Sequence, residues 1–330
     1  MKTDMDTHSG NGQSYLPVEI VDRQFPPGYD FSPMAPQRRP LWPALVLFAL
    51  TVLSTLAVGS EYASSYALNQ EPFSNGGDSF STVLLAVHNP RVILMGLPFS
   101  LTLLGILLTH ELGHYFASKI YGIDVSYPYF IPAPTLFGTF GAFIKIRSPI
   151  TTRRALFDIG IAGPVAGFAI ALPAMGYAIA TSKIIPGIED SAAIVFGTPP
   201  LMRIFLYLFH PHADPSSLLL NPVGRAAWMG LFATALNLLP IWQLDGGHIV
   251  FSLWDRQHQR ISLVLAAVTL AMGRLSPVWY LWGGLLFILC IRFRHPPLLD
   301  PWEPLGASRK LWAVAALVIF LLCFTPWPAR

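Results

Sequence analysis

Two histidines and a glutamate lie close together in an otherwise apolar stretch of the sequence, LLGILLTHELGHYFASKIYG, which covers residues 103–122. His110 and His114 are four positions apart, so in a helix both imidazoles face the same side and can bind one metal ion. Glu111 lies beside that position and can accept a proton from a water molecule next to the metal. The pattern His-Glu-x-x-His predicts a zinc site with His110 and His114 as ligands and Glu111 as the catalytic base.

These ionisable side chains are costly in such an apolar segment. Moving even one of them to the middle of a bilayer costs at least about 2.5 kcal/mol on insertion scales, so a cluster there indicates a functional site. A structural interpretation also exists, in which the two imidazoles and the carboxylate only satisfy one another in the polar interior of a helix bundle.

A third ligand is needed, because catalytic zinc usually takes three protein ligands. Two acids, Asp158 in ALFDIGIAG and Asp245 in NLLPIWQLDGGH, are embedded in later apolar sequence. Asp245 is favoured because Pro240 and Gly246-Gly247 interrupt the helix around it, and non-helical backbone at membrane depth occurs where it lines a protein cavity. Asp158 closely follows two arginines and is interpreted as an acid at the membrane interface.

The remaining histidines have less specific roles. His248 lies three residues after Asp245. It either orients the Asp245 carboxylate as a hydrogen-bond donor or faces the lipid headgroups. The others lie at the ends of apolar segments or in loops and are expected to be solvated: His88, His210, His212, His258 and His295.

The composition is that of a membrane protein. Of the 330 residues, 53% are hydrophobic and only 12% are charged, and the mean hydropathy is +0.51. The net charge of +3 is spread over short groups of Lys and Arg between apolar segments, which excludes a nucleic-acid-binding patch. Cys290 and Cys323 both lie in apolar segments, so no disulfide and no thiolate metal site is expected.

Seven apolar segments approach the 17–25 residues that a helix needs to cross a bilayer. Two are short, so the number of spans is expected to lie between six and eight. The predicted fold class is therefore an all-α polytopic membrane protein. The seven segments are Leu41–Ser60, about Val92–Ile120, Ala155–Ala180, an interrupted segment that starts at Arg225, Ile261–Met272, Val278–Ile291 and Leu311–Phe324.

The polar ends and loops suggest how the chain is oriented. Residues 1–40 are polar and proline-rich and are predicted to be a disordered cytoplasmic tail, followed by a membrane-embedded domain over 41–330 with a catalytic core at about 91–255. Two arginines precede the first span, and Glu61–Pro90 contains no Lys or Arg. The positive-inside rule therefore places the N-terminus inside and the loop Lys183–Pro222 outside.

The segment Val125–Ile150 between the second and third spans is a poor helix former. It is rich in proline, glycine and aromatic residues, and it has no charge before Lys145. We expect a membrane-dipping β-hairpin or loop. Its end, GAFIKIR, alternates apolar and basic residues as a β-strand does. The exposed edge of such a strand can pair with an unwound substrate. The alternative is that the segment is only a structural plug or an anchor at the interface.

HELGH in one span and NLLPIWQLDGGH in a later one, together with GTFGAFIKIRSPITTRRALFDIGIAGPVAGF between them, resemble the site-2 protease family of intramembrane zinc metalloproteases, in the type that lacks a PDZ domain. The resemblance covers about Leu101–Val250. It implies one Zn²⁺ held by His110, His114 and Asp245, with Glu111 as general base. It also implies that Asn237 holds the substrate strand or supports the oxyanion.

The resemblance implies hydrolysis of peptide bonds within or near transmembrane segments, in regulated intramembrane proteolysis or in the clearance of membrane stubs. Its partners would be transmembrane protein substrates, the lipid bilayer and an upstream site-1-type protease. The charge pattern puts the site in the cytoplasmic half of the bilayer. The alternative from another class is a catalytically silent scaffold that binds client helices. A prenyl-protein protease would need a glutamate ligand in a later span, and a zinc transporter would need a polar path across the membrane; neither feature is present in the sequence.

Overall fold

A computed structural model describes residues 40–73, 89–293, 295–296, 298, 300 and 304–329. Residues 41–330 form one compact unit. The predicted tail over residues 1–40 lies outside the described residues except for Pro40, and so does His88.

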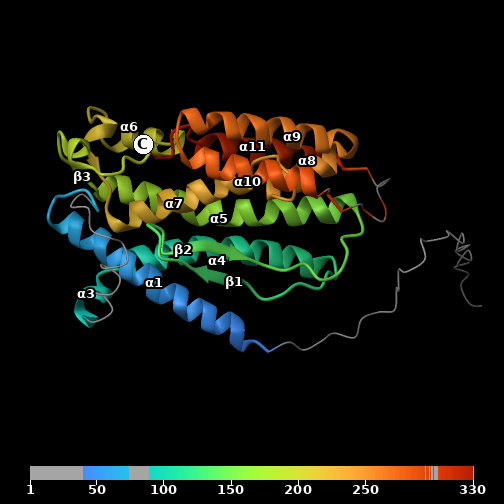
Figure 1. Ribbon diagram of the computed structural model, residues 1–330, viewed down its shortest axis with the longest axis horizontal. Helices are drawn as coiled ribbons and strands as arrows, with labels where there is room; N and C mark the ends of the chain where they lie inside the picture. Colours follow the sequence, from blue (N-terminus) through green and yellow to red (C-terminus); the bar gives the residue numbers. More distant parts are fainter. Residues whose placement is uncertain are drawn as a thin grey trace, which may run out of the picture. The chain divides into compact units, whose positions relative to one another are not determined.

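Three helices, α4 (Leu97–Ile120), α5 (Arg153–Thr181) and α7 (Pro222–Asn237), pack against one another at the centre of this unit (Figure 1). Small residues allow the close packing. A Cβ atom on Gly113 of α4 would lie only 2.5 Å from the carbonyl oxygen of Ala162 in α5. Large apolar side chains such as Ile106, Phe157 and Leu231 fill the buried core between the helices. The centre of the unit is therefore a tightly packed three-helix layer.

Local sequence signals explain where several helices begin. A proline stands in the first turn of α1 (Trp42–Ala67), α4 and α7, where its missing N–H has no helical partner to lose. At the start of α5 the side chain of Thr152 accepts a hydrogen bond from the backbone N–H of Ala155, and Asn221 caps α7 by accepting from Gly224.

The other helices surround this layer. α1 packs against α4, and α8 (Asp245–Leu253) packs against α5 and α9 (Asp255–Ala271). α9 pairs with α10 (Val278–Arg292), and α11 (Ala307–Cys323) packs against α5, α6 (Pro200–Phe209) and α7. A five-residue helix, α3 (Pro90–Leu94), precedes α4.

Each of the seven predicted spans corresponds to helical structure. The predicted interruption of the fourth is present, because α7 ends at Asn237 and α8 begins at Asp245. Gly246 and Gly247 do not break the helix as expected, since both lie in the first turn of α8. In the described part of the chain, two helices, α1 and α5, are both long and apolar enough to cross a membrane. α4 has 24 residues, but its histidines and glutamate lower its mean hydropathy. The full count of seven spans stays a prediction.

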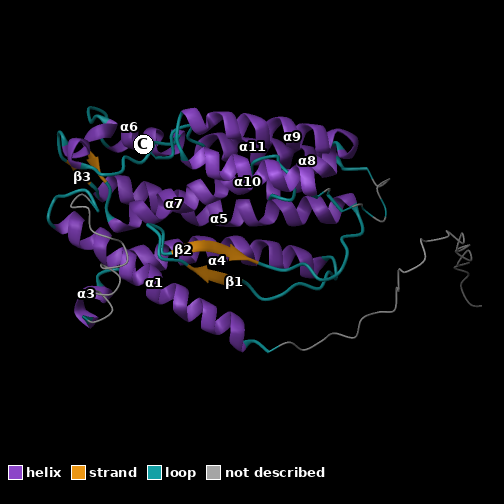
Figure 2. Ribbon diagram, in the orientation of Figure 1, coloured by secondary structure: helices purple, strands orange, loops and turns teal. Residues whose placement is uncertain are grey.

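Two short strands, β1 (Tyr129–Pro132) and β2 (Thr139–Phe143), follow α4 in the chain and pair antiparallel (Figure 2). The hairpin packs against α1 and α4. Its turn is fixed to α1, since Ser54 Oγ donates to the carbonyl of Gly138 at 2.6 Å and Tyr62 Oη donates to that of Leu136 at 3.0 Å. β2 ends earlier than the predicted strand GAFIKIR. Beyond it, only an isolated bridge joins Ile146 to Val125.

The predicted outer loop, residues 183–222, contains more structure than expected. It forms α6, two 3₁₀ turns (Ile188–Ser191 and Pro215–Ser217) and a two-residue pairing of β3 (Lys183–Ile184) with β4 (Leu218–Leu219). α6 packs against the end of α5, where a Cβ atom on Gly176 would lie 3.3 Å from the ring of Phe205.

Candidate metal centre

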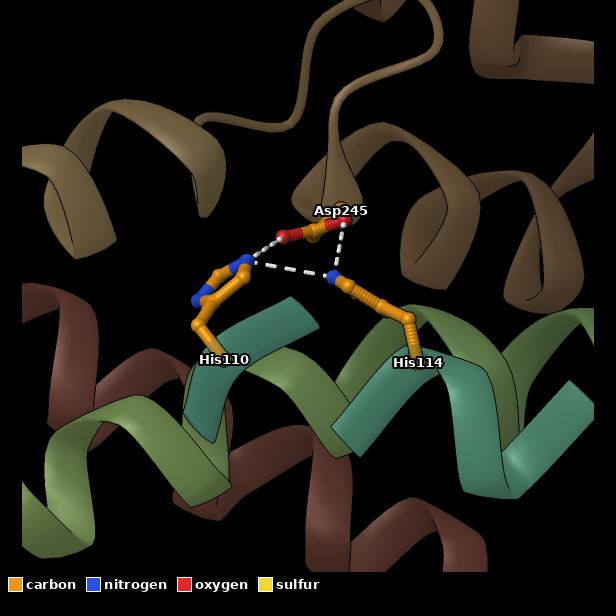
Figure 3. Close-up of side chains that lie close together, drawn as sticks. All are labelled: His110, His114 and Asp245. Carbon is orange, nitrogen blue, oxygen red and sulfur yellow. Dashed lines mark hydrogen bonds and ion pairs between the residues drawn. The ribbon is translucent and has the colours of Figure 1, made fainter. Parts of the chain in front are cut away.

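The side chains of His110, His114 and Asp245 converge on one point between α4 and α8 (Figure 3). The two histidine Nε2 atoms are 3.1 Å apart. One Asp245 oxygen lies 3.2 Å from His110 Nε2, and the other lies 3.3 Å from His114 Nε2. Asp245 reaches the histidines because it is the first residue of α8, directly after the helix interruption. The three side chains thus surround one point as a triangle, and one ligand atom from each lies within 4.8 Å of the others.

The separations of 3.1, 3.2 and 3.3 Å have the size expected between ligand atoms of a tetrahedral zinc ion. Zn–N and Zn–O bonds of about 2.0–2.1 Å at tetrahedral angles put neighbouring ligand atoms about 3.3 Å apart. Moreover, Asp245 Oδ2 is buried and accepts no hydrogen bond from any described residue, although it lies at ion-pair distance from His110. Such a buried oxygen normally has a partner. A cation at the centre of the triangle would supply it.

A backbone carbonyl orients the second histidine. His114 Nδ1 lies 2.7 Å from the carbonyl oxygen of Ile159 in α5. Because a carbonyl only accepts hydrogen bonds, Nδ1 carries the proton and Nε2 presents its lone pair toward Asp245 and His110. This is the tautomer that binds a metal through Nε2.

Glycines of α5 make room for both imidazoles. A Cβ atom on Gly163 would overlap the ring of His114, and one on Gly167 would lie 3.1 Å from His110 Cβ. The glycine and alanine content of this helix is visible in the sequence and indicates close packing. The sequence alone does not reveal which ring each glycine faces.

Glu111 is buried, with 6% of its surface exposed. Its carboxylate lies beside the two histidines, Asp245 and the backbone N–H of Ile144, which follows β2. β2 itself packs against α4. The structure therefore brings the predicted general base, the metal-binding triangle and the end of the hairpin together. The contribution of Ile144 has no sequence signal, because it is a backbone contact across the fold.

Asn237, the last residue of α7, also faces the centre. Its Nδ2 atom lies 3.3 Å from His110 Nε2. The side chain is half-buried, so its amide reaches the same space as the three potential ligands. An amide here can donate to an oxygen atom held at the site.

Asp158 lies away from the triangle. Both of its carboxylate oxygens accept hydrogen bonds from Arg309 of α11, at 2.7 and 2.8 Å, and Tyr121 at the end of α4 donates to it as well. Asp158 therefore joins the ends of three helices. Of the two acids considered as a third ligand, only Asp245 approaches the histidines.

The expectation that the outlying histidines are solvated is wrong for His258, which is 1% exposed and lies 3.1 Å from the carbonyl of Trp242. It is also wrong for His210, whose Nε2 lies 3.0 Å from the carbonyl of Ile179. His212 is exposed as expected.

His248 follows neither alternative proposed from the sequence. Its Nδ1 lies 2.9 Å from His295 Nε2, and His295 in turn stacks on Phe251 with ring centroids 3.9 Å apart. His295 is half-buried rather than fully solvated. These contacts connect α8 to the segment after α10.

Comparison with known proteins gives one family match and several relatives. The model of peptidase family M50 matches residues 98–294. A probable chloroplastic zinc metalloprotease, EGY1, of Arabidopsis thaliana is 31% identical over 302 residues, which cover 86% of this chain and 52% of that protein. The probable chloroplastic zinc metalloprotease EGY2 of the same plant is 32% identical over 256 residues, covering 75% and 45%. The chain thus spans about half the length of the curated relatives it matches. The family match confirms the resemblance to site-2 proteases.

Proposed function

The chain belongs to peptidase family M50, and we propose that it is an intramembrane zinc metalloprotease that hydrolyses peptide bonds within or near the transmembrane segments of other proteins. The observation that carries this proposal is the triangle of His110, His114 and Asp245 with Glu111 beside it. The relatives described as probable zinc metalloproteases support the choice of zinc.

In this proposal His110, His114 and Asp245 hold the ion. Zinc bound there supplies Lewis acidity, which polarises a peptide carbonyl and makes a nearby water molecule more acidic. Glu111 accepts the proton of the attacking water and later delivers it to the leaving amine. Asn237, through Nδ2, donates a hydrogen bond to the carbonyl oxygen as negative charge develops on it.

In this proposal the end of the hairpin also holds the substrate. A transmembrane helix satisfies its own carbonyls, so it has to unwind before cleavage, and the freed backbone needs new partners. β1 pairs with one edge of β2, and the backbone N–H of Ile144 lies beside Glu111. We propose that an unwound substrate strand adds to the free edge of β2 and its continuation, which brings the scissile carbonyl next to Glu111.

We further propose the membrane placement expected from the sequence. The chain crosses the bilayer seven times with its N-terminus in the cytoplasm, and the active site lies in the cytoplasmic half. Arg153 and Arg309, at the starts of α5 and α11, support this because basic residues gather on the inner side. Cleavage there would release an inner fragment of the substrate, in signalling or in clearance of stubs left by an upstream site-1-type protease.

The direct test is cleavage of a transmembrane model substrate in liposomes that contain the purified chain and zinc. We expect Glu111→Gln to reduce cleavage at least about 100-fold while zinc stays bound, because only the proton-accepting group is removed. Arg260→Gln on the exposed surface of α9 is the matched control and should cleave normally. If the wild type binds client helices but cleaves none under any zinc loading, the chain is a scaffold rather than a protease.

A further inference from the structure

An apolar groove lies on the side of α8 that faces α11. Its volume is about 590 Å³. Leu238 and Pro240 of the interruption and Ile249 and Leu253 of α8 form one wall. Ala313, Leu317 and Phe320 of α11 form the other wall. Nothing in the proposed peptidase chemistry uses this groove, although one of its walls belongs to the helix that carries Asp245.

One end of the groove is cationic. Lys310 lines it there, close to the start of α11, and Trp254 follows α8. Lys310 is exposed and forms no ion pair with any acid in the described part of the chain. Two acids at the nearby helix starts are already neutralised, Asp158 by Arg309 and Asp255 by Arg153. The charge at this end of the groove is therefore free to attract an anion.

These features point to one kind of occupant. We propose that the groove binds a phospholipid with an anionic headgroup, whose phosphate pairs with Lys310 and whose acyl chain lies between α8 and α11. Lys and Trp are among the side chains that lie at the headgroup level of a bilayer. From Lys310 to Phe320 the groove follows α11 for about 15 Å at 1.5 Å per residue. This length matches the depth of one leaflet, about half of the 30 Å hydrocarbon core.

A substrate helix fits this groove less well. β2, beside the general base, packs against α4 and α1, whereas α11 packs against α5, α6 and α7 on the opposite side of the central layer (Figure 1). A substrate seated between α8 and α11 would therefore be separated from the strand edge that is placed to hold it. A lipid needs no access to Glu111.

The lipid would support the segment that leads into the metal site. Leu238 directly follows Asn237, and Ile249 lies one helical turn after Asp245. An acyl chain packed on both would fill space beside the interrupted backbone. The inference rests on the proposed membrane placement and does not depend on peptidase activity.

Native mass spectrometry of the full chain in mild detergent tests this directly, with phosphatidylglycerol and zwitterionic phosphatidylcholine as probes. We expect one phosphatidylglycerol to be retained by the wild type and equally by Glu111→Gln, which separates this result from any result on cleavage. Lys310→Gln should weaken retention about fivefold, because one interfacial lysine contributes about that factor toward an anionic lipid. Lys310→Arg should restore the retention of phosphatidylglycerol. Ala313→Phe should fill the groove and abolish the retention of phosphatidylglycerol and of phosphatidylcholine.

Arg260→Gln removes the same charge from an exposed position outside the groove and is the matched control. The proposal is overturned if this control loses as much lipid as Lys310→Gln, since binding would then reflect diffuse charge. It is also overturned if Lys310→Gln and Ala313→Phe both retain phosphatidylglycerol like the wild type. A photoreactive group at Leu317 that captures a substrate helix instead of lipid would contradict it as well.

Discussion

Gly163 shows how closely the metal centre depends on single residues. The imidazole of His114 occupies the space that a side chain at Gly163 would need, and the carbonyl of Ile159, one turn earlier on the same helix, orients that imidazole. α5 therefore acts as a wall that fixes the position of a ligand on α4. The packing of α4 against α5 therefore also sets the geometry of the metal site.

We predict that Gly163→Ala removes zinc binding while the chain still folds. The added methyl group overlaps His114, so the ring has to leave the triangle. Gly105→Ala is the matched control, because a Cβ atom there meets no other atom within 4 Å. Alanine is the better helix former by about 1 kcal/mol, so the control should be as stable as the wild type or slightly more stable. Equal zinc contents in both variants would contradict the assigned packing.

At the residue scale, the sequence predicts the parts of the site that follow from local rules. Helix periodicity puts His110 and His114 on one face of α4, and the interruption at Pro240 favours Asp245 as the third ligand. The roles of Gly163 and Ile144 could not be predicted, because both depend on contacts between segments far apart in the chain. The burial of His258 could not be predicted for the same reason. Its position near the end of a predicted span does not reveal its contact with the carbonyl of Trp242.

At the scale of elements, β2 is the part whose role is most open to test. It ends at Phe143, and the next residue turns its backbone N–H toward Glu111. Ser126 then holds the following residue, Lys145, through hydrogen bonds of 2.8 and 2.9 Å. The backbone at residue 144 is thus fixed on both sides while its own N–H faces the site.

Ile144→Pro should reduce substrate cleavage at least tenfold and leave zinc content unchanged. Proline removes the N–H beside Glu111 and the donor that a substrate strand would use, but it does not touch the three ligands. Ile144→Val keeps the N–H and should cleave like the wild type. The measurement is the initial rate on a transmembrane model substrate. Normal cleavage by the proline variant would rule out pairing at this position and favour a plug or anchor role for the hairpin.

Apolar segments predict the long helices to within a few residues, as the match of Ala155–Ala180 to α5 (Arg153–Thr181) shows. The same pattern misses the polar residues by which a helix extends beyond its apolar segment. α9 starts at Asp255, six residues before its predicted start, because the sequence DRQHQR continues the helix without apolar residues. β2 is shorter than the alternating pattern suggests, since the backbone beyond Phe143 bonds to Ser126 instead of continuing the pairing with β1.

At the scale of the whole molecule, the arrangement places the metal centre inside a helix bundle with the hairpin on one side and the α8–α11 groove on the other. The two histidines lie on α4, which packs against α5 and α7, and Asp245 lies on α8. The surrounding helices carry many exposed apolar side chains, for example Leu281 of α10 at 73% and Leu311 of α11 at 72%. Such a surface fits a lipid environment.

The proposed topology predicts opposite labelling of two loops. Thr151→Cys, before α5, should react with a membrane-impermeant maleimide only from the cytoplasmic side, and His212→Cys, after α6, only from the other side. Both positions are exposed, whereas the native Cys290 and Cys323 are buried and give a low background. Labelling of intact cells and of inverted vesicles distinguishes the sides. Reaction of Thr151→Cys from outside would overturn the orientation.

The measurement that tests the central claim most directly is zinc content per chain, by elemental mass spectrometry of the detergent-purified protein. We predict one zinc per wild-type chain, none in His110→Ala and Asp245→Asn, and one in Asp158→Asn, because Asp158 binds Arg309 and not the histidines. Size-exclusion chromatography confirms that each variant is folded. Zinc retained by folded Asp245→Asn, or no zinc in a folded and zinc-loaded wild type, would contradict the three-ligand site.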